Sequence, residues 1–191
     1  LNHKFKNRKI WIASSTHSNE EIFCAKSHLY LKKKVKNLLT ILIPRHVHRA
    51  KEIKSELANL NLKVINHSSN KKNLKDTDIY IVDTFGETKK FHKIGCSVFI
   101  GGSIINRGGQ NPLEAARYGA RILHGPNINN FKDVYKTLSN LKISKKITTS
   151  KKLASLIIFK RNKTQGDKIK KIGVKILKET INDLDEIIKN E

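Results

Sequence analysis

Short apolar runs alternate with amphipathic segments along this chain, and that alternation limits the possible folds more than any other feature. The runs are apolar on every side, as strands buried on both faces of a sheet are. We expect strands at 10–14, 38–43, 62–65, 79–82, 98–100 and 121–123. Between them, apolar residues recur at helical spacing, for instance at Ala50, Ile53 and Leu57. Strands that alternate with helices predict an α/β fold, with a Rossmann-like, doubly wound and mostly parallel sheet.

Capping signals predict where several helices begin. S-x-x-E at 18–21 and T-x-x-E at 84–87 are typical of capping boxes. At 111–114, Asn stands at the expected cap and Pro at the first helical position of another helix. Asn130 is the expected cap of the helix that follows, and two more helices are predicted at about 151–159 and 167–188.

A change in composition near the C-terminus suggests how the chain is divided. The segment 160–166 (KRNKTQG) is polar and shows no apolar period, so we expect a soft joint there. We therefore predict a Rossmann-like domain over 1–160 and a helical extension over 161–191. The chain contains no methionine, even at position 1, and we expect it to begin inside a longer protein or to have been trimmed.

The net charge of +23 predicts attraction to polyanions, such as nucleic acid, an anionic membrane or a phosphorylated substrate. Heavy use of Lys, Ile and Asn would also follow from an AT-rich coding sequence, and both explanations stay open. The basic residues are spread along the chain and only 6% of residues are aromatic, so nucleic-acid binding is not expected. Cys24 and Cys96 are far apart and form no metal pattern, which fits a reducing compartment. No signal peptide or apolar stretch of about 20 residues is visible.

Polar and glycine-rich turns follow the expected strands, at the edge of a parallel sheet where ligands bind. These turns are 15–17, 44–46, 84–87, 101–103 with 107–111, and 125–126. Backbone N–H groups at such turns favour anions. Glu87 and Glu114 also fit simple helix-capping acids, and Arg45 fits a solvated surface residue. Neither a G-x-G-x-x-G fingerprint nor a P-loop is present.

Five of these segments, in order, resemble the C-terminal domain of the 3-deoxy-D-manno-octulosonic acid (Kdo) transferases. They are WIASSTHSNEE (11–21), ILIPRH (41–46), DTFGE (83–87), FIGGSIINRGGQNPLEAARYG (99–119) and GPNINNF (125–131). The resemblance covers roughly residues 9–141 and is most specific in the fourth segment. It implies the C-terminal half of a GT-B glycosyltransferase, whose donor is CMP-Kdo.

The resemblance also implies which residues bind the donor. They are Pro44, Arg45, Phe85, Gly86, Glu87, Asn111, Pro112, Leu113 and Glu114. It places the catalytic base in an N-terminal domain, so no catalytic residue is expected in this chain, and it implies no metal and no cofactor. This sequence departs from the family pattern at Gln110, where a histidine is usual, at Thr88, where a leucine is usual, and at Ser18–Asn19, where Glu-Gly is usual.

The family's reaction transfers Kdo from CMP-Kdo to a lipid A precursor in lipopolysaccharide biosynthesis. The implied partners are CMP-Kdo, the lipid A precursor, the N-terminal domain and the membrane surface, at the cytoplasmic face of the bacterial inner membrane. We expect the chain alone to transfer nothing. Two alternatives remain open, namely another GT-B nucleotide-sugar transferase domain and, as the less favoured one, a basic nucleic-acid-binding module.

Overall fold

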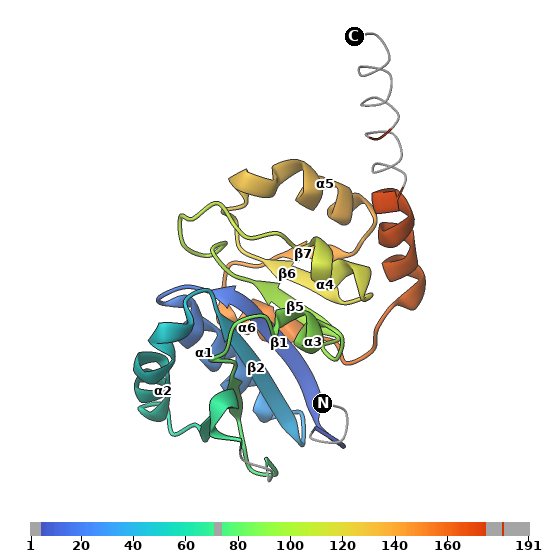
Figure 1. The fold of residues 1–191 in the computed structure, drawn as a ribbon. Helices are drawn as coiled ribbons and strands as arrows, with labels where there is room; N and C mark the ends of the chain where they lie inside the picture. The colour runs from blue at the N-terminus through green and yellow to red at the C-terminus, as the bar shows by residue number, and fades with distance from the viewer. Residues whose placement is uncertain (1–4, 71–73, 175–180, 182–191) are drawn as a thin grey trace.

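The computed structural model describes residues 5–70, 74–174 and 181. These residues are arranged around a single parallel sheet (Figure 1). The sheet has seven strands in the order β3-β4-β2-β1-β5-β6-β7, and every neighbouring pair is parallel. The strands are β1 (Lys9–Thr16), β2 (Leu38–Pro44), β3 (Val64–Asn66), β4 (Ile79–Ile81), β5 (Ser97–Ile100), β6 (Arg121–His124) and β7 (Ser144–Lys146). The α/β, doubly wound prediction is confirmed.

Helices cover both faces of the sheet, so two separate apolar cores form (Figure 1). The helices are α1 (Glu20–Lys32), α2 (Ala50–Ala58), α3 (Thr88–His92), α4 (Leu113–Arg117), α5 (Lys132–Asn140) and α6 (Ser150–Leu156), with a further helix over 163–174 and 3-10 turns at Val47–Arg49, His67–Ser69 and Asn129–Phe131. Helices α1, α2 and α6 pack on one face, where they bury Cys24, Ile53 and Leu153. Helices α3, α4 and α5 pack on the other, where Phe91 and Tyr135 are buried.

The central strand β1 lies at the point where the winding of the sheet reverses. It pairs with β2 on one side and with β5 on the other, with Ile12 opposite both Ile41 and Val98. The chain leaves β1 towards β2 and returns to β5, so the connections diverge at the carboxyl ends of β1 and β5. Open α/β sheets bind ligands in the crevice that such a divergence leaves.

Two strands differ from the prediction. Strand β3 lies at Val64–Asn66 rather than 62–65, and its three residues are only partly buried. Strand β7 was not predicted, because its sequence Ser-Lys-Lys has no apolar run and only Ser144 is buried. Both are edge strands, and an edge strand is held by backbone pairing with one neighbour and needs little apolar burial.

Three of the predicted helix starts are wrong. Helix α1 is preceded by Asn19, at φ 73°, and no side chain caps it, so the S-x-x-E capping box at 18–21 does not form. Helix α3 begins at Thr88 rather than in the turn at 84–87. Asn130 lies in a 3-10 turn before α5, and its side-chain amide instead donates to the Arg107 carbonyl at 3.2 Å. At Asn130 a contact distant in sequence replaces the predicted cap.

The segment at the predicted joint is bound to the sheet domain. The Arg161 guanidinium donates to the carbonyls of His92 (2.7 Å) and Gly95 (2.8 Å), and the Asn162 N–H donates to Gly119. Ile169, on the helix over 163–174, is buried in the same core as α3 and α4. The predicted helix at 167–188 therefore starts earlier, and the part at 175–180 and beyond 181 lies outside the described residues. The division at residue 160 stays a prediction.

A buried ionic network closes the amino edge of the sheet. Asp78 receives hydrogen bonds from Lys32, at 2.5 Å, and from the Lys63 N–H, and His28 lies 3.4 Å away. Burial alone would raise the pKa of Asp78, but the bonds from His28 and Lys32 outweigh it and hold that pKa far below its usual range. Among the described residues, no helix is both long enough and apolar enough to cross a bilayer.

Candidate functional site

The carboxyl end of β1 has an unusual backbone that brings it close to the loop after β5. Its pairing with β2 is irregular between Ser14 and Thr16, and Ser15 lies between them at φ 56°. The Gly101 N–H donates to the Ser14 carbonyl at 2.8 Å. A Cβ placed on Gly101 would lie 2.2 Å from the Ser15 carbonyl oxygen, so only glycine allows this approach.

Glu20 holds the loop after β5 against α1, and its role was not predicted. It is fully buried, and its carboxylate accepts backbone N–H bonds from Gly102 (2.7 Å), Ser103 (3.0 Å), Ile104 (2.9 Å) and His17 (3.1 Å). Charge-assisted bonds of this kind are stronger than neutral ones. One feature of the sequence could have indicated this role, namely an acid that closely follows a polar turn at a strand end. The predicted capping box instead involved its neighbour Glu21.

Basic side chains gather around this junction. Burial lowers the pKa of His17, and the positive charges of its neighbours lower it further. Those neighbours are His46, Arg107, Arg45 and Arg49. The His17 and His46 rings lie 5.8 Å apart, edge to face. Such a concentration of positive charge beside a parallel-sheet edge attracts anions.

The arginines of this group differ in what they contact. Arg49 is already neutralised by Glu21, at 3.0 Å, and by Glu52, at 3.2 Å. Arg45 is exposed, and its backbone N–H donates to the Thr16 carbonyl, which fixes it beside β1. Within residues 5–70 and 74–174, no carboxylate pairs with Arg45 or Arg107. These two guanidinium groups therefore remain open to a ligand.

The turn after β4 presents an aromatic side chain to solvent. Phe85 is 82% exposed, which is uncommon for so large an apolar group. Gly86 has φ 79° and nothing within 4 Å of a Cβ placed there, so the backbone has open space beside it. Glu87 pairs with Lys90 at 2.9 Å. Gly86 was predicted at a helix N-terminus, but α3 starts two residues later. This turn therefore contributes the exposed Phe85 ring and the open Gly86 backbone to the site.

The start of α4 agrees with the prediction to within one residue. Helix α4 begins at Leu113, and the Asn111 side chain accepts its N–H at 2.9 Å. Pro112 is buried and fixes the turn. Helices α3 and α4 have five residues each, so their dipoles are small and side chains dominate the electrostatics here. The Glu114 side chain is 43% exposed.

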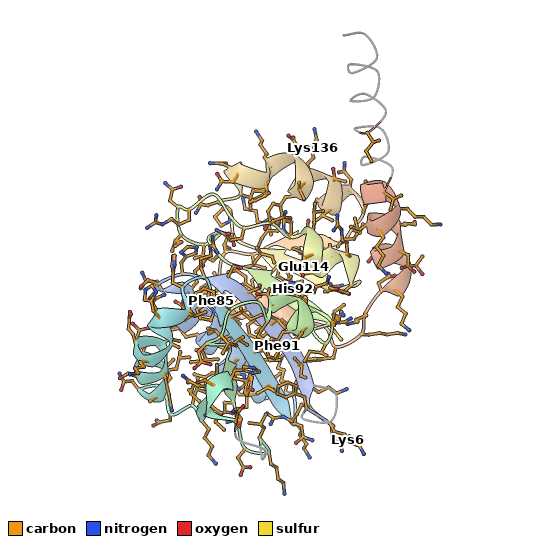
Figure 2. All side chains as sticks on the ribbon, viewed as in Figure 1. Lys6, Phe85, Phe91, His92, Glu114 and Lys136 are labelled. Carbon is orange, nitrogen blue, oxygen red and sulfur yellow. The ribbon has the colours of Figure 1, made fainter. Side chains whose placement is uncertain are left out.

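A buried histidine lies behind Glu114 and was also missed by the sequence analysis. His92 Nε2 lies 3.0 Å from Ser14 Oγ, and Nδ1 lies 3.5 Å from Glu114 Oε2. Figure 2 shows the His92 and Glu114 side chains next to each other, on α3 and α4. Burial lowers the pKa of His92 to about 4, with Arg161 as the second cause, so the ring is neutral at pH 7.

The predicted donor-binding residues thus lie at the end of β2, in the turn after β4 and at the start of α4. Arg45 follows β2, Phe85 follows β4, and Glu114 is connected through His92 to the end of β1. A hollow of about 410 Å³ lies at the opposite edge of the sheet. Its Arg8 and Asp78 side chains already have partners within the fold, and Arg8 donates to the Leu38 carbonyl. In the described part of the chain, no group of three or more His, Cys, Asp or Glu side chains could hold a metal ion.

Comparison with known proteins identifies the relatives of this chain. It is 34% identical to the 3-deoxy-D-manno-octulosonic acid transferase of Haemophilus influenzae over 133 residues, or 70% of this chain. It is 33% identical to that of Rickettsia bellii over 159 residues, or 83% of this chain. The chain is a homologue of the Kdo transferases. A probable mitochondrial Kdo transferase of Arabidopsis thaliana is 33% identical over 68% of the chain, whereas no family model matches. The chain spans about a third of the length of these curated relatives, at 31%, 38% and 30%.

A solved structure shares the fold. It is the C-terminal CMP-Kdo binding domain of WaaA from Acinetobacter baumannii, which superposes with a TM-score of 0.75 and covers 80% of this chain and 79% of that one, at 24% identity. This Kdo transferase homologue therefore shares the Rossmann-like fold of that domain.

Proposed function

We propose that this Kdo transferase homologue is the donor-binding domain of a glycosyltransferase that uses CMP-Kdo. The observation that carries the proposal is the position of Arg45. Its guanidinium has no carboxylate partner among the described residues and lies at the sheet edge that also presents Phe85 and Glu114. Two kinds of similarity support CMP-Kdo as the donor, because the relatives are Kdo transferases and the solved structure with this fold is a CMP-Kdo binding domain.

Each predicted residue has a role that its surroundings allow. Arg45 binds the donor phosphate through a forked, charge-assisted contact, and Pro44 fixes it at the end of β2. The exposed Phe85 ring stacks on the cytosine, and the open backbone at Gly86 lets the nucleotide approach. Glu114 accepts hydrogen bonds from the ribose hydroxyls. The remaining four residues, Glu87, Asn111, Pro112 and Leu113, shape the two turns.

The reaction proposed for the whole enzyme is transfer of Kdo to a hydroxyl of the lipid A precursor. The hydroxyl oxygen attacks the anomeric carbon with inversion, the bond from that carbon to the phosphate oxygen breaks, and CMP leaves with the electron pair. A base in a separate N-terminal domain accepts the hydroxyl proton. This chain stabilises the negative charge on the departing CMP. We propose that the reaction needs no metal and occurs at the cytoplasmic face of the inner membrane, where basic residues add attraction to anionic lipid.

Titration of the chain with CMP, UMP and GMP tests the donor. The expected result is preferential binding of CMP, with NMR shifts at the amides of Gly86 and Asn111. Arg45→Gln should weaken CMP binding by about tenfold or more, since bonds to charged groups contribute roughly 1.5–3 kcal/mol. Lys6→Gln removes one positive charge near the start of β1, away from the site, and should leave CMP binding unchanged (Figure 2).

Two outcomes would contradict the proposal. Equal binding of all three nucleotides would indicate another nucleotide-sugar transferase domain. Broad, salt-sensitive binding of oligonucleotides without any preference for CMP would indicate the nucleic-acid alternative.

A transfer assay with CMP-Kdo and a lipid A precursor should show no turnover by the chain alone, whether or not EDTA is added to remove metal ions.

A further inference from the structure

Three polar side chains converge on one point above Gly102, in the loop that Glu20 holds. A Cβ placed on Gly102 would lie 3.5 Å from Arg107 Cβ, 3.5 Å from Gln110 Nε2 and 3.6 Å from His17 Cδ2. The three residues come from the turn after β1 and from two places in the segment after β5. Gly102, at φ 68°, leaves this point empty of any side chain of its own. The side chains of Arg107, Gln110 and His17 therefore border this point.

The backbone of this group is fixed, although its side chains remain available. Asn130 donates to the Arg107 carbonyl at 3.2 Å, and the Tyr135 hydroxyl donates to the Gln110 carbonyl at 3.0 Å. The His17 N–H is bound by Glu20. In contrast, His17 Nε2 is buried and has no hydrogen-bond partner in the described chain. A buried ring nitrogen without a partner is costly unless a ligand supplies one.

Backbone amides do not compete for an anion at this point. The N–H groups of Gly102, Ser103 and Ile104, which would otherwise form an anion-binding nest, already donate to Glu20. Burial is the first cause that lowers the pKa of His17 and so favours the neutral ring, in which one N–H can donate to an anion. Positive charge comes from Arg107, which has no carboxylate partner among the described residues.

The donor offers two anions that lie close together. The relatives transfer an octulosonic acid, whose carboxylate is attached to the anomeric carbon. In the CMP-linked donor that same carbon carries the phosphate oxygen. A site for this donor therefore needs two neighbouring groups of anion ligands. The chain has two such groups near His17. The His17 ring lies 5.8 Å from the ring of His46, which follows Arg45, and Arg107 also lies close enough to lower the pKa of His17.

We propose that His17, Arg107 and Gln110 form a subsite for the carboxylate of the donor's sugar acid, next to the phosphate site at Arg45. This inference rests on the proposed function. The subsite makes the domain selective for a nucleotide-linked 2-keto sugar acid over a neutral sugar, because a neutral sugar leaves Arg107 and His17 desolvated without a partner. It also gives Gln110 a role in binding that needs no proton transfer.

Paired affinities for CMP-Kdo and CMP test the subsite, measured by calorimetry on the 191-residue chain. Arg107→Gln should weaken binding of CMP-Kdo about 10- to 100-fold and leave CMP within about twofold, because CMP lacks the carboxylate. Gln110→Glu, which places a negative charge at a partly exposed position, should weaken CMP-Kdo selectively as well. His17→Phe keeps the ring volume and removes the donor. Lys6→Gln serves as the control for the loss of a distant charge.

The outcomes separate this inference from the function on which it rests. If CMP does not bind the unsubstituted chain, the proposed function fails. If CMP binds and Arg107→Gln weakens CMP as much as CMP-Kdo, the cluster binds the phosphate and the carboxylate subsite is refuted. If both ligands bind Arg107→Gln and Gln110→Glu normally, the subsite is also refuted. Circular dichroism of each variant shows whether it is folded, and a poorly folded His17→Phe leaves the other two variants to decide.

Discussion

The buried His92 makes the stability of this domain depend on pH in a way that one substitution should remove. Burial and Arg161 lower its pKa from 6.5 to about 4 in the folded chain. The unfolded chain, with the ordinary pKa, therefore binds one more proton than the folded chain between these two values. The contribution of His92 to the free energy of unfolding is therefore complete above pH 6.5 and is lost as the pH falls towards 4.

The magnitude follows from that pKa difference. At 1.36 kcal/mol per pKa unit, a difference of about 2.5 units corresponds to a loss of roughly 3 kcal/mol across the whole window. Typical domains are stable by only about 5–15 kcal/mol, so the loss is large enough to measure. Glu114, 3.5 Å from the ring and partly exposed, reduces the loss because it can pair with a protonated His92.

Urea unfolding of the wild type and of His92→Gln, at several pH values from 7.5 to 4.5, tests this reasoning. Other titrating groups act on both chains alike, so the difference between the two curves reports His92. That difference should change by roughly 2–3 kcal/mol in favour of His92→Gln as the pH falls. His92→Leu should lose the same slope despite a lower stability at pH 7.5, because Ser14 then loses its partner. Parallel curves for the wild type and both variants would refute a neutral, buried His92.

Four further substitutions test contacts that hold the fold together. Glu20→Gln should lower the free energy of unfolding by about 2–4 kcal/mol, measured in urea, because four backbone N–H groups lose a charged acceptor; an unchanged urea midpoint would contradict this. Gly101→Ala should destabilise by about 2 kcal/mol or more, since its Cβ would meet the Ser15 carbonyl at 2.2 Å. Gly173→Ala should be neutral or stabilising in thermal melts, because the added Cβ would meet only the flexible end of an arginine side chain, at 3.2 Å. Asp78→Asn should lower stability at pH 7 by about 1–3 kcal/mol and have little effect below the lowered pKa of Asp78, where the wild type has also lost this charge.

Local sequence patterns predicted the central elements of the fold well. Strands β1, β2, β4, β5 and β6 lie where the apolar runs are, because a strand buried on both faces must be apolar along its whole length. Edge strand β7 escaped prediction because pairing with β6 alone holds it. The capping boxes at 18–21 and 84–87 were wrong because a Ser or Thr three residues before Glu is compatible with many turns.

The site was predicted in its outline but not in its internal contacts. The turns that carry Arg45, Phe85 and Glu114 were found because polar and glycine-rich turns at strand ends are visible in the sequence. His92 and Glu20 were missed because their partners are distant along the chain. His92 contacts Ser14, 78 residues away, and Glu20 accepts from Gly102, 82 residues away.

The sequence by itself therefore determined the class of fold and the edge of the sheet at which a ligand would bind. Periodicity and turn composition are local properties, and they act over the few residues that one strand or one helical turn contains. Only the tertiary structure decided which buried charge meets which backbone. Glu20 became a loop anchor, and Arg107 came close to His17, because β1 and β5 are neighbours in the sheet. Adjacency of strands distant in sequence brings these groups together, and no pattern within either segment records it.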